Sequence, residues 1–453
     1  MKNYKKPWEN GYLKVGENGR YLYNSETPFF WLADTGWLLF QRLDLQESYR
    51  YLRNRRCKGF NVIQTMVLHR VPMENKAGKQ PFYNNDLTKV CDEPDGYWKH
   101  IDKVLDMAEE MGLYLAMVPA WGDILKCGIL NDDNVEKYVS FLAQRYGDRP
   151  NIIWIVGGDL LGSLGQNTWN QMGKLLKIMC PKHLVTFHPV TGTSSSLWFH
   201  EQPWLDFNMF QSGHSSYRQV QENNPAFVSD EQLSYAEDNW RYIQHDLTLV
   251  PQKPSLDAEP SYENIMKGLK NWGVRHWKAK DVRRYAYWSA FAGALGVTYG
   301  HNAIMQMYFD GVGPGSFGVM DYWYEAIHHV GSGQMTHLKK LMESVPFTEG
   351  RAAQDLVEGA DDEKYNRIAV FAQKEFLFAY TYTGRMVSVK PNALTCEKVD
   401  AYWMNPENGD ISFIVQYEAW KAASFEPVVR AENENDWVLI LVNAQSEFFY
   451  KSE

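Results

Sequence analysis

The sequence NIIWIVGGDLL occupies residues 151–161. Its segment Ile152–Val156 is a run of apolar, largely β-branched residues, too short for a typical helix and typical of a strand buried on both faces. Two glycines follow, and then one carboxylate, Asp159. A buried parallel strand that ends in glycines and an acid predicts a charged group at the mouth of an α/β barrel. Taken alone, Asp159 could also be a simple capping residue of the turn that follows the strand.

Seven more strand-like runs accompany this one, and helical periodicity separates most of them. The other strand runs cover residues 29–33, 60–69, 113–121, 184–189, 205–214, 254–260 and 294–302. The predicted helices cover residues 45–58, 97–111, 134–146, 169–179, 237–247, 279–291 and 328–342. This alternation predicts an α/β fold, a (β/α)8 TIM barrel. A doubly wound open sheet is the alternative, but no GxGxxG motif follows the first strand.

The pattern of the chain changes after about Ser344. Short alternating runs, broken by turns such as Asn408-Gly409, replace the helical periodicity. They predict a small all-β domain, most simply a β-sandwich, which we expect to contribute packing rather than chemistry. We therefore expect a catalytic barrel over residues 1–345 and the β domain over residues 346–453. Residues 1–28 form an N-terminal hairpin or extension of the barrel, with its turn at Asn18-Gly19.

Composition restricts the partners of the protein. The net charge is −9 and no basic run stands out, so we expect binding neither to nucleic acid nor to a membrane surface. The 17 Trp, 27 Tyr and 22 Phe residues suit a large core, and also a cleft in which rings stack on sugars. The five cysteines show no paired spacing, which favours reduced, mostly buried thiols.

The N-terminal residues carry no apolar segment of the kind found in export signals. No segment approaches 18 consecutive apolar residues. The sequence as given therefore predicts a cytoplasmic protein, or a periplasmic or secreted one if a signal was removed.

Polar and aromatic side chains stand near the end of almost every predicted strand. The carboxyl ends of barrel strands build the active site, so these residues are the candidates for it. Asp159 and Glu259 end the fourth and seventh strands, which lie across the mouth from one another. Hydrolysis of a glycosidic bond needs two such carboxyl groups on either side of the anomeric carbon. The candidates for binding substrate are Asp34, His69, Trp121, His188, Gln211, His214, His301 and Asn302.

Two other acids compete with Glu259 for the catalytic role. Asp257 lies two residues earlier on the same strand, and we expect it on the same face but deeper in the barrel. Glu263 is better explained as a residue of the loop or of a helix start. Glu259 is therefore the favoured acid of the three.

The histidines raise the possibility of a metal-dependent hydrolase. Barrel metallohydrolases usually carry HxH at the end of the first strand, where this chain has Ala33, Asp34 and Thr35. His328 and His329 are adjacent on a predicted helix and so point in different directions. We therefore expect no catalytic metal and no other cofactor.

Several segments, in order, resemble the signature segments of the apiosidase-like barrel hydrolases, glycoside hydrolase family 140. They are FFWLADTGW (29–37), GFNVIQTMVL (59–68), IIWIVGGD (152–159), EPSYE (259–263) after LDA, and YGHNAIMQM (299–307). The tail, with AYWMNPENGDI (401–411) and NDWVLIL (435–441), resembles the collagen-binding-type β domain that usually follows this barrel. The resemblance covers nearly the whole chain.

The resemblance implies a retaining glycosidase that acts on pectic carbohydrate of the plant cell wall. The known activity of the family is release of an apiose-bearing side chain from rhamnogalacturonan II. By motif, Asp159 corresponds to the general acid/base and Glu259 to the nucleophile. The Gly-Gly-Asp sequence stands where the wider barrel clan has Asn-Glu, which marks a subgroup. A non-catalytic protein that binds oligosaccharide or polysaccharide on the same barrel is the alternative, although it would not need both acids.

Overall fold

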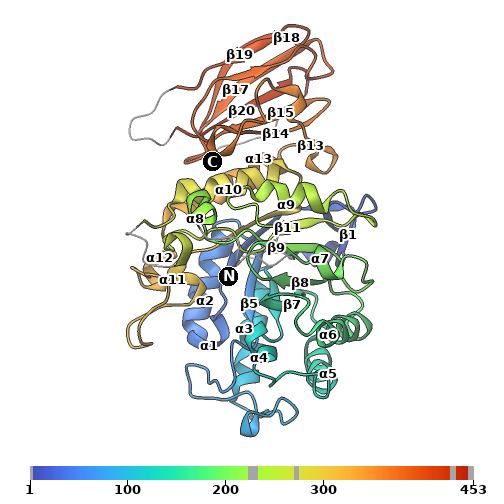
Figure 1. The fold of residues 1–453 in the computed structure, drawn as a ribbon, viewed down its shortest axis with the longest axis vertical. Coiled ribbons are helices and arrows are strands. Elements are labelled where there is room, and N and C mark those ends of the chain that lie inside the picture. The colour runs from blue at the N-terminus through green and yellow to red at the C-terminus, as the bar shows by residue number, and fades with distance from the viewer. Residues whose placement is uncertain (1–3, 223–232, 270–274, 429–434, 447–453) are drawn as a thin grey trace.

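The computed structural model describes residues 4–222, 233–269, 275–428 and 435–446. Its larger part is a parallel barrel (Figure 1). The barrel strands are β4 (Trp31–Thr35), β5 (Val62–Met66), β6 (Tyr114–Val118), β7 (Ile152–Leu160), β8 (Val185–Pro189), β10 (Asn208–Gln211), β11 (Ser255–Asp257) and β12 (Gly296–Tyr299). β12, β4, β5, β6, β7 and β8 form one parallel sheet in that order, and β10 pairs with β11 in parallel.

Single backbone hydrogen bonds close the ring between these two groups of strands. The amide of Asp206, just before β10, donates to the carbonyl of Val185 in β8 at 2.8 Å. The amide of Leu295, just before β12, donates to the carbonyl of Ser255 in β11 at 3.0 Å. The predicted barrel is therefore confirmed, and its eight strands follow the order of the sequence.

Helices cover the outside of the barrel close to the predicted positions. The long ones are α2 (Leu45–Cys57), α3 (Tyr97–Glu110), α5 (Val135–Tyr146), α6 (Gln166–Met179), α9 (Asn239–Asp246), α10 (Ala279–Phe291) and α13 (Val330–Glu343). Short helices lie in the connections: α1 (Leu39–Arg42), α4 (Gly122–Lys126), α7 (Ser196–Phe199), α8 (Tyr217–Glu222), α11 (Asn302–Met305) and α12 (Trp323–Ala326). No helix in the described ranges is both long and apolar enough to cross a lipid bilayer.

Local sequence explains where α2 begins. The side chain of Asp44 accepts from the amide of Glu47, and the Glu47 side chain accepts in return from the amide of Asp44. This capping box satisfies two amides that the helix itself leaves without partners. At the other end, Gly59 follows with a φ of 79°, which favours glycine.

The N-terminal segment adds a small antiparallel sheet to the barrel. It contains β1 (Leu13–Val15), β2 (Leu22–Asn24) and β3 (Thr27–Phe29), in the order β1-β2-β3. The first two strands form the expected hairpin, and Gly19 in its turn has a φ of 67°. A further short strand, β9 (Thr193–Ser194), pairs antiparallel with β10 inside the barrel domain.

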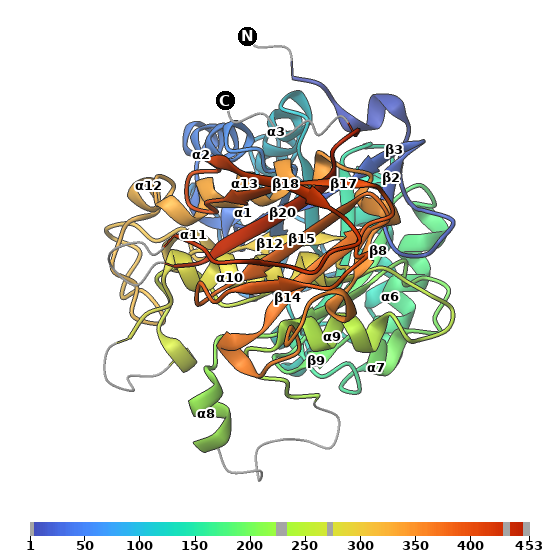
Figure 2. The same cartoon turned by 90° about the horizontal axis from the view of Figure 1, so that it is seen from above.

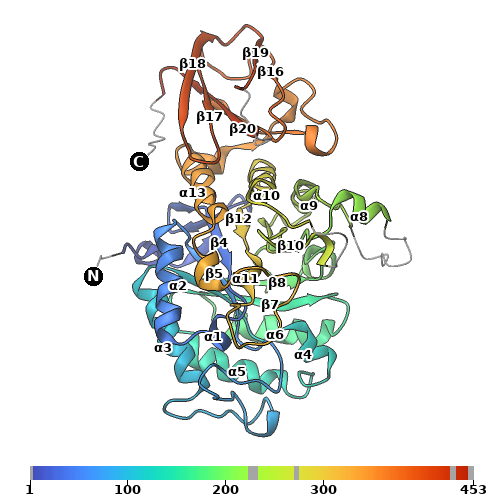
Figure 3. The same cartoon turned by 90° about the vertical axis from the view of Figure 1, so that its left-hand side faces the viewer.

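The C-terminal domain is built on an antiparallel sheet that lies over α10 and α13 (Figures 1 and 3). The order of its strands is β13 (Arg351–Ala352), β14 (Ile368–Gln373), β15 (Phe376–Thr381), β20 (Trp437–Asn443), β17 (Lys398–Met404) and β18 (Ile411–Glu418). A two-stranded sheet of β16 (Val387–Val389) and β19 (Ala423–Phe425) packs on the other face. The second layer of the predicted sandwich is therefore small.

The two domains share one apolar core. Phe291 of α10 stacks on Phe371 of β14, with ring centroids 6.1 Å apart. Met342 of α13 and Ile440 of β20 belong to the same buried cluster. Figure 2 shows the sheet seen from above, spread over these helices. Because burial of apolar surface is the main favourable contribution to folding, separating the domains would expose part of this core to water.

The cysteines differ in part from expectation. All five are free, as predicted from their spacing. Only Cys91 and Cys180 are buried, whereas Cys57 and Cys127 are exposed.

Candidate active site

The end of β7 is a bulge that turns Asp159 out of the sheet. Gly157, Gly158 and Asp159 have φ values of 83°, 133° and 48°, and the pairing with β8 shifts register between Gly157 and Leu160. A left-handed conformation costs an ordinary residue about 1–2 kcal/mol, and such strain is concentrated at functional sites. The residues before Asp159 in the strand are buried, whereas Asp159 is exposed.

Contacts around the two glycines explain why no larger residue fits. A Cβ atom on Gly158 would lie 2.4 Å from the ring of Trp121. A Cβ atom on Gly157 would lie equally close to the ring of Phe187. The glycines therefore serve both the backbone conformation and the close approach of two aromatic walls.

Glu259, which follows β11, lies between two histidines. Nε2 of His214 lies 3.1 Å from Oε1 of Glu259, and Nε2 of His188 lies 3.4 Å from Oε2. Nδ1 of His188 lies 3.0 Å from the carbonyl oxygen of Pro189. His188 comes from β8 and His214 from the loop after β10, so neighbouring parts of the barrel converge on one carboxylate.

The two carboxyl groups differ in their readiness to ionise. Loss of hydration in the cleft is the largest cause that raises the pKa of Asp159 to about 7, and the negative charge of Glu259 adds to it. Burial alone would also raise the pKa of Glu259, but the close imidazoles of His188 and His214 outweigh it and lower the pKa to about 2. Near neutral pH, Glu259 is therefore a carboxylate, while Asp159 can hold a proton.

An aromatic wall stands beside these carboxyl groups. The ring of Trp121 lies 5.3 Å from that of Trp37 and 5.5 Å from the imidazole of His188. Trp37 also lies 5.5 Å from His188. Trp37 was not among the residues predicted for the site, although its place directly after the first strand, in the motif Thr-Gly-Trp, was a signal for it. Such rings suit stacking on the C–H face of a sugar.

Two other predicted residues lie at strand ends and have polar atoms without partners among the described residues. His69 follows β5, and its Nδ1 is buried without a hydrogen bond. Burial, with the positive charges of Arg70 and Arg42, lowers the pKa of His69. Gln211 ends β10 and is buried, and its Oε1 likewise has no partner. These two strand-end side chains therefore have unused capacity for hydrogen bonds among the described residues.

Asp34 does not belong to this group. It is fully buried, accepts from the hydroxyl of Tyr51 at 2.7 Å and pairs with Nε of Arg55 at 2.5 Å. Both partners belong to α2 on the outside of the barrel. Asp34 therefore joins the first strand to its helix.

The two acids that compete with Glu259 are engaged elsewhere. Asp257 accepts from the hydroxyl of Ser212 at 2.7 Å and from the side-chain amide of Asn239, at the start of α9, at 3.1 Å. It thus faces the helix layer, not the face of Glu259 as expected from the sequence. Glu263 is buried and accepts from the hydroxyl of Tyr299 at 2.6 Å. Of the three, Glu259 is the one that lies against the mouth histidines.

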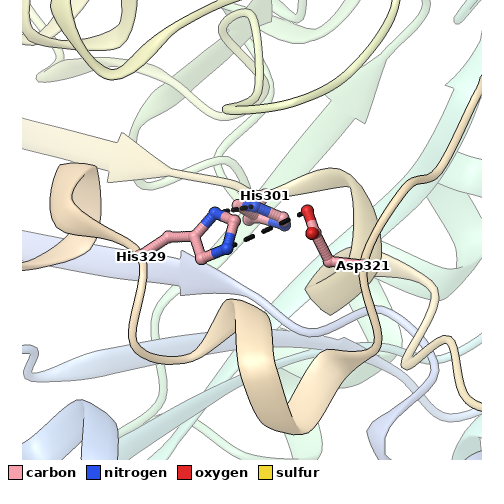
Figure 4. A group of neighbouring side chains, drawn as sticks. All are labelled: His301, Asp321 and His329. Carbon is pink, nitrogen blue, oxygen red and sulfur yellow. Dashed lines mark hydrogen bonds and ion pairs between the residues drawn. The ribbon is translucent and has the colours of Figure 1, made fainter.

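His301 and Asn302 follow the last strand, but they hold a loop. Figure 4 shows His301 beside His329 and Asp321. Nε2 of His301 lies 3.0 Å from Nδ1 of His329, and Nε2 of His329 lies 3.9 Å from Oδ2 of Asp321. The side-chain amide of Asn302 donates to the carbonyl of Phe317 at 2.9 Å. These contacts anchor the segment of residues 306–322.

The cluster of His301, His329 and Asp321 brings three potential metal ligands within 4.8 Å of one another. However, Nδ1 of His301 accepts a hydrogen bond from the amide of Ala303 at 3.1 Å, as the cap of α11. The proton of the neutral ring is therefore on Nε2, where it points to His329 rather than leaving a lone pair for a metal. The donor set thus fits a hydrogen-bonded chain better than a metal centre.

Two family models match this chain. Residues 16–349 match the family described as "Apiosidase-like, catalytic domain", and residues 352–442 match "Putative collagen-binding domain of a collagenase". Among curated proteins, none matches the chain.

Solved structures are similar over nearly the full length. One, titled "Glycoside hydrolase", is 40% identical with a TM-score of 0.93 and covers 98% of this chain and 100% of its own. A second, a glycoside hydrolase family 5 protein from Bacteroides vulgatus, is 37% identical with the same TM-score and covers 99% and 97%. A third, titled "putative glycoside hydrolase" and from the same species, is 14% identical with a TM-score of 0.65, covers 96% of this chain and 82% of its own, and shares the fold.

The family matches, the full-length similar structures and the barrel agree on a glycoside hydrolase with a carbohydrate substrate. This chain belongs to the apiosidase-like family of glycoside hydrolases.

Proposed function

We propose that the protein is a retaining glycoside hydrolase of pectic carbohydrate in the plant cell wall. Asp159 is the general acid/base of the proposed reaction, and Glu259 is the nucleophile. The proposed substrates resemble those of apiosidases, namely glycosides of the rhamnogalacturonan II side chains. The pectic substrate is supported by membership of the apiosidase-like family.

The observation that carries the proposed mechanism is the opposite shift of two acids. The pKa of Asp159 is raised to about 7, whereas that of Glu259 is lowered to about 2. Cleavage of a glycoside by two carboxyl groups needs one that is protonated and one that is ionised at the same pH, in retaining as in inverting enzymes. Two carboxyl groups in similar environments would not provide this division of roles.

In the first step, the carboxylate of Glu259 attacks the anomeric carbon. The bond from that carbon to the leaving oxygen breaks, and the proton of Asp159 passes to this oxygen. The product is a glycosyl ester on Glu259, with Asp159 now ionised. In the second step, Asp159 takes a proton from water, the water oxygen bonds to the anomeric carbon, and the ester bond to Glu259 breaks.

The surrounding side chains have supporting roles in this proposal. Trp37 and Trp121 provide rings on which the sugar can stack. His69 and Gln211 offer unpartnered polar atoms to sugar hydroxyls. His188 and His214 keep Glu259 ionised and limit its rotation. A retaining mechanism also requires the two carboxyl groups to lie about 5–5.5 Å apart.

The test is a screen of glycosides with product analysis. Apiosides, rhamnosides, arabinosides and pectic oligosaccharides are incubated with the protein, with Asp159→Ala and with Glu259→Ala. The proposal expects release of sugar from a pectic oligosaccharide or apioside by the wild-type protein, and its loss in Glu259→Ala. Binding of these ligands with no turnover of any of them would instead support the non-catalytic alternative.

A further inference from the structure

Two consecutive arginines of α10, Arg283 and Arg284, lie where the barrel meets the C-terminal domain. Each binds a buried carboxylate that also accepts a hydrogen bond from a tyrosine of the C-terminal domain. Both arginines are fully buried. Arg283 binds both carboxylate oxygens of Asp436, at 2.9 and 3.0 Å, and the hydroxyl of Tyr380 donates to the same carboxylate at 3.1 Å. Asp436 belongs to the C-terminal domain, so this group joins that domain to α10.

The group around Arg284 differs, because its carboxylate, Glu237, belongs to the barrel domain. Glu237 is fully buried and accepts from Nη2 of Arg284 at 2.5 Å. The hydroxyl of Tyr365, from the C-terminal domain, lies 2.9 and 3.1 Å from its two oxygens. The amide of Tyr217 donates to the same carboxylate at 2.9 Å. One carboxylate thus connects the C-terminal domain to the start of α8.

Tyr217 lies three residues after His214, the partner of Glu259. His214 itself is held by its backbone: its carbonyl accepts from the amide of Gly268 at 2.7 Å and from the indole of Trp277 at 3.0 Å. The segment from His214 to Tyr217 is therefore fixed at both ends. The fixed point at Tyr217 depends on Glu237, and through it on Tyr365.

A second series of contacts leads from Tyr382 of the C-terminal domain to the backbone of His214. The hydroxyl of Tyr382 donates to Asp281 at 2.9 Å. Asp281 lies 3.8 Å from Nζ of Lys267, which stands 4.0 Å above the ring of Trp277. Trp277 in turn donates to the carbonyl of His214.

We infer that the C-terminal domain positions His214 in the proposed active site, through the contacts of Tyr365 with Glu237 and of Tyr382 with Asp281. Tyr365 and Tyr382 are then positioning residues: they touch no substrate, but they hold the segment that carries the histidine bound to Glu259. This inference rests on the proposed function for its catalytic consequence. The structural part, a fixed His214, is independent of it.

The test removes one hydroxyl at a time. Tyr365→Phe deletes the bond to Glu237, and Tyr380→Phe is the control, because it deletes a tyrosine–carboxylate bond to Asp436 at the same interface. A hydrogen bond to a charged group is stronger than one between neutral groups. Since only part of the effect of its loss reaches His214, we expect kcat/KM to fall roughly three- to tenfold in Tyr365→Phe and to stay unchanged in Tyr380→Phe.

A pH profile separates positioning from mere stability. If Glu259 loses part of its bond from His214, its pKa rises, and the acid limb of kcat/KM moves to higher pH in Tyr365→Phe only. The double variant Tyr365→Phe/Tyr382→Phe should extend both effects. Equal unfolding midpoints of Tyr365→Phe and Tyr380→Phe would show that the two interfaces are weakened alike.

The imidazole resonances of His214 provide a readout that needs no substrate. In protein with labelled histidine, we expect them to shift in Tyr365→Phe and not in Tyr380→Phe. Identical resonances and pH profiles in the two variants would refute the positioning role. A wild-type protein without activity on any glycoside would refute the proposed function, while the resonances would still decide the structural part.

Discussion

Nε2 of His214 lies 3.1 Å from Oε1 of Glu259, within a barrel mouth that also holds Asp159. This contact, with that of His188, keeps Glu259 ionised. The charge so retained is the second-largest cause of the raised pKa of Asp159. The protonation of Asp159 therefore depends in part on the charge of Glu259, a relationship that a double-displacement mechanism can use.

The raised pKa of Asp159 has a consequence for stability. Between about pH 4 and pH 7, the folded protein keeps a proton that the unfolded chain, with the ordinary pKa of 3.8, has largely lost. Asp159 therefore lowers stability as the pH rises through this range. We expect Asp159→Asn to gain about 1 kcal/mol over wild type between pH 4 and pH 8, a small value because solvent screens the exposed carboxyl group. Urea unfolding at both pH values measures it, and an unchanged difference would contradict the raised pKa.

Gly158→Ala should impair the site without unfolding the barrel. The added Cβ would meet the ring of Trp121 at 2.4 Å, and a displacement of about 1 Å at a reacting group can cost about 100-fold in rate. Gly128→Ala is the matched control, because Gly128 also has a positive φ but has open space around it. We expect about a 100-fold fall in kcat/KM for Gly158→Ala and nearly full activity for Gly128→Ala. Equal activities would show that the bulge does not set the position of Asp159.

Asp34→Asn should reduce stability rather than substrate binding. It leaves the buried guanidinium of Arg55 without its counter-charge, a change that costs about 3–5 kcal/mol. Asp355→Asn breaks an exposed pair with Arg351 and should cost less than about 1 kcal/mol. Unfolding in urea gives both values. A changed KM with unchanged stability in Asp34→Asn would place this residue in the substrate site after all.

Metal removal should have no effect on the protein. The proton on Nε2 of His301 points to His329, so the cluster with Asp321 is satisfied by hydrogen bonds. We expect dialysis against EDTA to leave the melting temperature and the activity unchanged, and added zinc to do the same. A rise in melting temperature with zinc in the wild type, absent in His329→Ala, would contradict this interpretation.

The pattern of the barrel could be predicted from the sequence, because its signals are local. Apolar runs such as Ile152–Val156 and the cap of α2 at Asp44 depend on a few neighbouring residues. The bulge at Gly158 could not be predicted, since a register shift depends on how two strands meet. The two glycines can be read from the sequence. The ring of Trp121, which leaves no room for a side chain at Gly158, is distant in sequence.

The sequence also could not predict the direction in which a side chain at a strand end points. Asp34 and Glu259 both follow apolar runs, yet Asp34 turns to Arg55 in α2, and Glu259 turns to the mouth histidines. His301 was expected at the mouth, but it caps α11 and binds His329. In each case the partner that decides the direction comes from a distant segment.

The central claim is the division of roles between Asp159 and Glu259, and azide rescue tests it most directly. Each residue is replaced by Ala, an aryl glycoside of the sugar identified in the screen is supplied with and without azide, and the anomeric configuration of the product is read by NMR. We expect Asp159→Ala to form the first intermediate normally and to regain turnover with azide, giving a glycosyl azide of retained configuration. Glu259→Ala should be inactive alone and should give the inverted azide. Asp159→Ala that is equally impaired on good and poor leaving groups, with no effect of azide, would contradict the assignment.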